Sequence, residues 1–212
     1  MSIIFIDDPA QILTREVKKL LTPVLVIFTL ALFSFCLPLA DRITIVIQPF
    51  GDIPPSYVSY VFKHLSMIIP GVIIKAPIPL PKSAFYAPRN RYRADSLIEF
   101  LDRNTPAGQA TIGLTILDIS CTDSRSPDWG IFGYSYCPGK ACIASSYRLR
   151  GMDKIDQLFK EAIHELGHTQ GILHCPDKHC FMQDAEGRNT TVNETGFCKE
   201  CKKKLIAKGW RL

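Results

Sequence analysis

The feature that most constrains this chain is a stretch of eleven residues, 164–174, with three histidines at fixed spacing. It reads H-E-x-x-H-x-x-G-x-x-H. The segment 153–168 leading into it has apolar residues at helical period, and Asp153 is a suitable N-cap. These apolar residues are Ile155, Leu158, Phe159, Ala162, Ile163 and Leu166. The first two histidines fall on the opposite face, one turn apart. The stretch predicts a helix with one buried face and two imidazoles on the other.

This spacing predicts a catalytic zinc site. Two histidines at i and i+4 on a rigid helix form a zinc-binding pair, and the glutamate between them can act as general base on the water that zinc activates. Gly171 permits positive φ at the helix end, so the chain can turn there and bring a third histidine to the same ion. The predicted ligands are His164, His168 and His174, with Glu165 as the catalytic base. Three solvated histidines opposite a core face are the alternative, which is weakened because the chain has only five histidines.

Two pairs of cysteines follow the histidines and predict a second, structural zinc site. The four predicted ligands are Cys175, Cys180, Cys198 and Cys201. The last two have the C-x-x-C spacing of structural zinc sites. Such a site would join the loop after His174 to a helix expected at 202–210. Two disulfides are the alternative if the domain lies outside the cytosol. Cys137 and Cys142 could pair there as well, or remain thiols.

The motifs as a whole resemble a known family. The histidine motif followed by a methionine, Met182, resembles the metzincin metallopeptidases. A cysteine directly after the third histidine, together with the later cysteines, is similar to the archaemetzincins, metzincins that carry a four-cysteine zinc site beside the catalytic one. Fifteen residues separate Met182 from Cys198, slightly fewer than in the family pattern, and a surface loop tolerates such a difference. The resemblance covers the C-terminal third at motif level and extends more loosely back to Arg42.

The resemblance implies a fold and an activity. The fold would be α+β, a mixed sheet with helices forming a metzincin-like catalytic domain. The protein would be a zinc metallopeptidase, of endopeptidase or aminopeptidase type, with two zinc ions and a peptide or protein substrate. Met182 would pack beneath the histidines. A hairpin of Gly130–Tyr136 and Ala141–Tyr147 would supply an edge strand that holds an extended peptide. The alternative is a zinc-stabilised module that binds peptides without cleaving them; the intact Glu165 argues against it.

Hydrophobic patterns predict the remaining elements of the domain, residues 41–212. Apolar, β-branched runs indicate strands and apolar residues at helical spacing indicate helices. The expected strands are Ile43–Ile47, Val72–Ile74 and Thr111–Ile119, and the expected helices are Ser56–Ile69 and Arg93–Arg103. This alternation favours a partly parallel sheet.

The N-terminus contains 21 consecutive residues without a charge, 20–40. As a helix this run would span roughly 30 Å, the thickness of a bilayer's hydrocarbon core. Basic residues precede it and Asp41 follows it, so the positive-inside rule places residues 1–19 in the cytoplasm and the catalytic domain on the non-cytoplasmic side. We therefore expect a transmembrane helix or signal anchor, and the membrane as a partner. The alternatives are cleavage after Ala40 with secretion, lipidation of Cys36, or a buried core helix.

The charge of the chain does not indicate a nucleic-acid partner. The net charge is only +5. Much of the excess lies in lysines near the C-terminus, which suit a solvated helix face. Basic and aromatic residues are not interleaved as in proteins that bind RNA or DNA, so no nucleic acid is expected.

Overall fold

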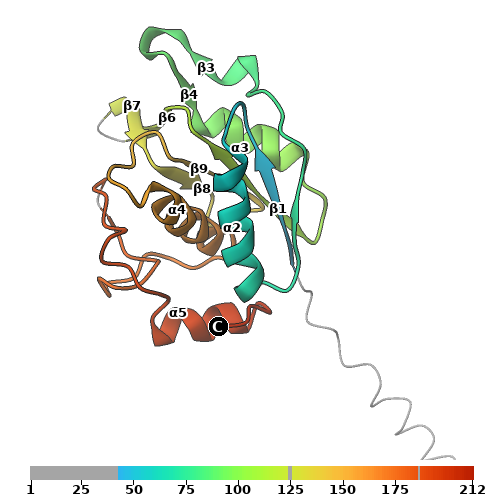
Figure 1. The fold of residues 1–212 in the computed structure, drawn as a ribbon, viewed down its shortest axis with the longest axis vertical. Coiled ribbons are helices and arrows are strands. Elements are labelled where there is room, and N and C mark those ends of the chain that lie inside the picture. The colour runs from blue at the N-terminus through green and yellow to red at the C-terminus, as the bar shows by residue number, and fades with distance from the viewer. Residues whose placement is uncertain (1–42, 124–125, 186) are drawn as a thin grey trace, which may run out of the picture. The chain divides into compact units, whose positions relative to one another are not determined.

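A mixed five-stranded sheet forms the centre of the protein (Figure 1). The computed structural model describes residues 43–123, 126–185 and 187–212. The strands of this sheet lie in the order β2 (Val72–Ile74), β1 (Thr44–Pro49), β5 (Gln109–Thr115), β9 (Ala141–Ser145) and β8 (Gly133–Ser135). Neighbouring strands are parallel except β8, which is antiparallel to β9 and forms one edge of the sheet.

Helices cover both faces of this sheet (Figure 1). Helices α2 (Pro55–Ile68) and α4 (Lys154–Thr169) pack on one face, and α3 (Ala94–Arg103) packs on the other. The alternation of side chains along a strand produces the two cores. In β9, Cys142 and Ala144 belong to the core beneath α2 and α4, whereas Ile143 belongs to the core beneath α3.

A smaller sheet and a C-terminal helix complete the described chain. The smaller sheet has the order β3 (Phe85–Tyr86), β4 (Arg91–Arg93), β6 (Ile119–Asp123) and β7 (Ser126–Ile131). Two short 3₁₀ turns, Lys82–Ala84 and Ala87–Arg89, flank β3. Helix α5 (Lys199–Ile206) buries Cys201 and Leu205 in the core that contains α2 and α4. The Arg211 amide, which follows α5, donates to the carbonyl of Ile68 at the end of α2.

Most predicted elements are present, but two predicted strands were wrong. The run Thr111–Ile119 is divided between β5 and β6, which lie in different sheets, and Gly130–Tyr136 is divided between β7 and β8. At the first division, the buried Asp118 accepts two hydrogen bonds from the Arg148 guanidinium, at 2.7 and 2.9 Å. The apolar pattern continues across both divisions, so it could not mark the change of sheet.

The predicted transmembrane helix is corrected. The described part of the chain contains no helix that is both long enough and apolar enough to cross a membrane. Its longest helix, α4, has 16 residues and carries charged side chains opposite its buried face. The expected anchor, residues 20–40, lies outside the described residues. An uncharged run shows hydropathy and not a helix, so the fold class is the α+β domain alone, and the single-pass membrane location is not retained.

Candidate metal centres and active site

Two residues of the first candidate centre lie on the face of α4 opposite its core-facing side, as predicted, and the third follows the helix. His164, His168 and His174 each offer one ring nitrogen, and the three nitrogens lie within 4.8 Å of one another. Apolar residues on the other face of α4 hold the helix against the sheet. After α4, Gly171 has a φ of 83°, and the chain turns there to bring His174 back to the other two histidines.

Backbone carbonyls orient two of the imidazoles. His164 Nδ1 donates to the Phe181 carbonyl at 2.6 Å, and His168 Nδ1 donates to the Ile172 carbonyl at 2.7 Å. A carbonyl only accepts, so both protons are on Nδ1 and both Nε2 atoms carry free lone pairs. Such second contacts are typical of metal-binding histidines, because they fix the tautomer and the ring orientation.

The arrangement of these lone pairs fits a cation. The two Nε2 atoms lie 3.0 Å apart, close to the ~3.3 Å expected for two ligands of one tetrahedral zinc. A proton between them would require an imidazolium. Burial, the first cause, and the neighbouring histidines lower the pKa of His164 to about 3, and burial lowers the pKa of His168. Two facing neutral acceptors repel each other unless a positive ion lies between them, so the donor set suits zinc.

The third histidine has a different environment. Nearly half of the His174 side chain is exposed, and the Asp184 carboxylate lies 3.4 Å from its Nδ1. Asp184 belongs to the segment after Met182. A carboxylate in this position orients an imidazole and increases its basicity.

Glu165 lies in the same cavity and is held by the edge strand. It is buried, and Ser135 Oγ of β8 donates to its Oε2 at 2.5 Å. A Cβ on Gly133 would lie only 2.6–2.9 Å from the Glu165 carboxyl and Cγ, so only glycine allows β8 to approach so closely. Burial raises the pKa of Glu165 to about 7, and the hydrogen bond from Ser135 opposes that rise. A carboxyl with this pKa can accept and release a proton near neutral pH.

Met182 packs beneath the histidines. It is fully buried, and its sulfur lies 2.4 Å from where a Cβ on Gly167 would stand. Gly167 lies in α4 between His164 and His168. Met182 therefore packs against the part of the helix that carries these two histidines.

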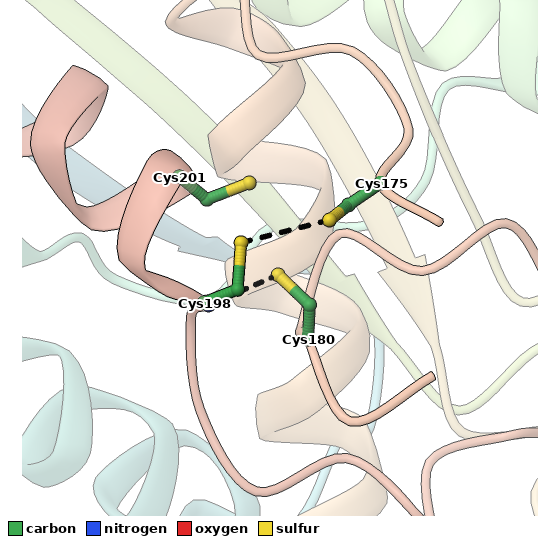
Figure 2. Close-up of side chains that lie close together, drawn as sticks. All are labelled: Cys175, Cys180, Cys198 and Cys201. Carbon is green, nitrogen blue, oxygen red and sulfur yellow. Dashed lines mark hydrogen bonds between the residues drawn. The ribbon is translucent and has the colours of Figure 1, made fainter. Parts of the chain in front are cut away.

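The four cysteines form the second candidate centre (Figure 2). Their sulfur atoms lie within 4.8 Å of one another, and none of the four is in a disulfide. Cys175 Sγ and Cys198 Sγ are 3.6 Å apart, and two sulfurs bound to one tetrahedral zinc lie about 3.8 Å apart. The Cys198 amide also donates to Cys180 Sγ at 3.3 Å. The geometry favours one four-sulfur metal site over the predicted alternative of two disulfides; Cys137 and Cys142 are not joined either.

The histidine centre opens into a cavity of about 370 Å³. The cavity is lined by residues of β7 and β8, by α4, and by residues of the segments 183–185 and 187–194. The predicted site residues inside this cavity are His164, Glu165, His168 and His174. The edge strand that holds Glu165 therefore borders the space in which a substrate would lie.

Some residues of this site have no signal in the sequence. Ser135 and Gly133 lie thirty or more residues before Glu165 and contact it only because β8 pairs with β9. The carbonyls of Phe181 and Ile172 are backbone groups, which any residue type supplies. The predicted hairpin was the only indication that this part of the chain lies near α4.

The chain matches a known peptidase family by sequence. The profile of peptidase family M54 matches residues 41–207. The archaemetzincin of Halobacterium salinarum is 30% identical over 174 residues, covering 76% of this chain and 98% of the relative. The archaemetzincin of Methanopyrus kandleri is 30% identical over 158 residues, covering 71% and 88%.

Comparison with solved structures supports the same family assignment. The crystal structure of the Methanopyrus kandleri archaemetzincin matches with a TM-score of 0.69 and 28% identity, covering 81% of this chain and 98% of that one. The Archaeoglobus fulgidus archaemetzincin matches with a TM-score of 0.66 and 25% identity, covering 76% and 99%. Both predicted zinc donor sets are present in the fold. The chain therefore belongs to peptidase family M54, the archaemetzincins, and is a zinc metallopeptidase.

Proposed function

We propose that His164, His168 and His174 hold the catalytic zinc of this peptidase and that Glu165 is its general base. The observation that carries the proposal is the facing pair of Nε2 atoms, 3.0 Å apart, in the same cavity as the buried Glu165. A zinc ion bound there would lower the pKa of a coordinated water and polarise the carbonyl of the bond to be cleaved.

The chain's own groups supply proton transfer and positioning. Ser135 holds Oε2 of Glu165, which leaves Oε1 to take a proton from the attacking water and to pass it to the leaving amine. Strand β8 is the free edge of the sheet beside the cavity. Its outer main-chain groups would pair with an extended peptide, as in strand addition.

The cysteine centre has a structural role in this proposal. Cys175, Cys180, Cys198 and Cys201 would hold the second zinc and join the loop after α4 to α5. Because Cys175 directly follows His174, this site would also fix the position of the third histidine. The proposed peptidase domain comprises residues 41–212.

Cleavage of a mixed peptide library by the zinc-loaded full chain tests the proposal. We expect cleavage that is lost with a chelator, and a fall of about 10²- to 10⁴-fold in Glu165→Gln, which removes the base. Glu165→Gln should keep its zinc, as measured by metal analysis. Glu99→Gln, an exposed position on α3, is the matched control and should cleave normally.

Two outcomes would decide against this assignment. Full activity in Glu165→Gln would exclude Glu165 as the base. Absence of all cleavage, with both metal sites loaded, would favour the peptide-binding module. Peptides with free and acetylated N-termini separate the two modes of action: an aminopeptidase requires the free amine, and an endopeptidase does not.

A further inference from the structure

Two glutamates that the zinc chemistry does not use line the same cavity. Glu161 lies on α4, one helical turn before His164 and Glu165, and therefore on the same face. Glu194 comes from the segment that crosses the cavity after Met182. The cavity thus contains two carboxyl groups in addition to the proposed base.

The protein supplies few hydrogen-bond donors to these two carboxyls. Glu161 is partly buried, and its carboxyl has no hydrogen bond or ion pair with the described residues. Glu194 is only 5% exposed. Thr190 Oγ1 donates to its Oε1 at 2.9 Å, while its Oε2 accepts no hydrogen bond from the described chain. None of these oxygens is among the buried atoms without a hydrogen-bond partner, so the carboxyl oxygens that the protein leaves unbonded are accessible and can accept a donor from a ligand in the cavity.

Lys160, which lines the same cavity, does not supply a hydrogen bond to either glutamate. The Lys160 ammonium lies 3.0 Å from Asp156 Oδ2 and donates to the Thr191 carbonyl at 2.9 Å. Burial raises the pKa of Glu161 well above its usual range, and the carboxyls of Glu165 and Glu194 add to that rise. Burial also raises the pKa of Glu194, although Thr190 and Lys160 oppose it. Arg188 also lines the cavity and is not without a partner, and the ion pairs of the described residues include neither Glu161 nor Glu194, so both carboxyls could accept a donor from an entering cation.

We propose that Glu161 and Glu194 form a subsite that binds a cationic group of the peptide substrate beside the catalytic centre. An ammonium or guanidinium group would donate charge-assisted hydrogen bonds to both carboxylates. Two parts of a peptide carry such a group, a lysine or arginine side chain and the N-terminal amine. The inference rests on the proposed function, because it requires that a peptide occupies this cavity.

Binding measurements test the subsite separately from catalysis. The zinc-loaded full chain with Glu165→Gln would be titrated with labelled peptides, followed by fluorescence anisotropy. One acetylated series moves a single lysine through an otherwise neutral peptide, with norleucine as the neutral counterpart at each position. A second pair has the neutral sequence with a free or an acetylated N-terminus. We expect about 10- to 100-fold tighter binding of a cationic peptide, the range for hydrogen bonds to charged groups.

The two arms identify the source of the cation. A lysine preference confined to one position identifies a side chain, and a preference for the free N-terminus identifies the amine. Adding Glu161→Gln or Glu194→Gln should reduce the preference at least about threefold, and both together should abolish it. Affinity for the neutral peptide should stay within about twofold. Glu99→Gln is the matched control and should leave the preference unchanged.

The results separate this inference from the proposed function. Equal affinity for cationic and neutral peptides, or a preference that survives the double substitution, would overturn the subsite even if the wild-type chain cleaves peptides. A preference that depends on both glutamates, with no cleavage by the wild-type chain, would support the subsite and refute the proposed function.

Discussion

At the scale of single residues, the site depends on groups that orient the side chains proposed to react. Two backbone carbonyls orient His164 and His168, and one hydroxyl holds Glu165. Each of these contacts leaves one atom of the oriented side chain available for chemistry. The histidine contacts cannot be removed by changing a side chain, whereas the Ser135 contact can.

Ser135→Ala should lower kcat by about tenfold, because it removes a hydrogen bond to a charged group that aligns the proposed base. That hydrogen bond lowers the pKa of Glu165, so its loss should move the acidic limb of the kcat–pH profile to higher pH. Zinc content and thermal stability should change little. Ser135→Thr keeps the hydroxyl and should recover most of the activity; a kcat unchanged in Ser135→Ala would show that the hydroxyl does not position the base.

At the scale of elements, two glycines set how closely neighbouring segments approach α4. Gly133 lets β8 lie against Glu165, and Gly167 lets Met182 lie against the helix. Glycine inside a helix normally costs about 1 kcal/mol relative to alanine. Its presence within α4 is therefore explained by the contact with Met182 and not by helix formation.

Gly167→Ala should destabilise the protein by about 1–3 kcal/mol, although alanine favours helices, because the new methyl group overlaps the Met182 sulfur. Chemical denaturation would measure the change, and a zinc competition assay should show weaker binding at the histidine centre. Gly167→Ala combined with Met182→Val, which shortens the neighbouring side chain, should cost less than the sum of the single changes. Additive losses would show that the two residues do not interact.

The sequence predicts the features that depend on local spacing, and it does not predict those that depend on contacts between segments far apart in the chain. The helix α4, its two histidines and the third histidine after it follow from spacing within a short segment, and so do the cysteine pairs. Ser135, Gly133 and Glu161 acquire their roles from the approach of β8 and of residues 183–194 to α4, which no local pattern encodes. The divisions at Asp118 and Phe132 were missed because the apolar pattern runs through them.

At the scale of the whole molecule, the two candidate metal centres are adjacent in the chain. His174 belongs to one and Cys175 to the other, and the Cys175 amide donates to the Met182 carbonyl at 2.7 Å. The methionine beneath the histidines, the third histidine and the first cysteine thus belong to one connected unit. Loss of the cysteine centre should therefore disturb the histidine centre, whereas loss of the histidine centre should disturb the cysteine centre less.

Cys198→Ser should reduce bound zinc from two ions to one per chain and lower the free energy of unfolding by several kcal/mol, because a structural zinc contributes its binding energy to folding. Activity should fall as well, since His174 loses its anchored neighbour. His168→Ala is the matched comparison: it should also lose one zinc, with a much smaller effect on stability. Metal analysis and thermal unfolding of both variants check this, and equal losses of stability would contradict a structural role for the cysteine centre.

Cys198 and Cys201 follow His174 by more than twenty residues, which sets the order in which a new molecule can complete its proposed catalytic centre. The helix with the first two histidines is translated and can fold while these cysteines are still missing. If the cysteines hold zinc as proposed, the segment carrying His174 would lack its anchor until they emerge from the ribosome. A chain under synthesis would then hold an incomplete catalytic centre until residues 198–201 have folded, and the cysteine site would delay the onset of proteolysis to that point.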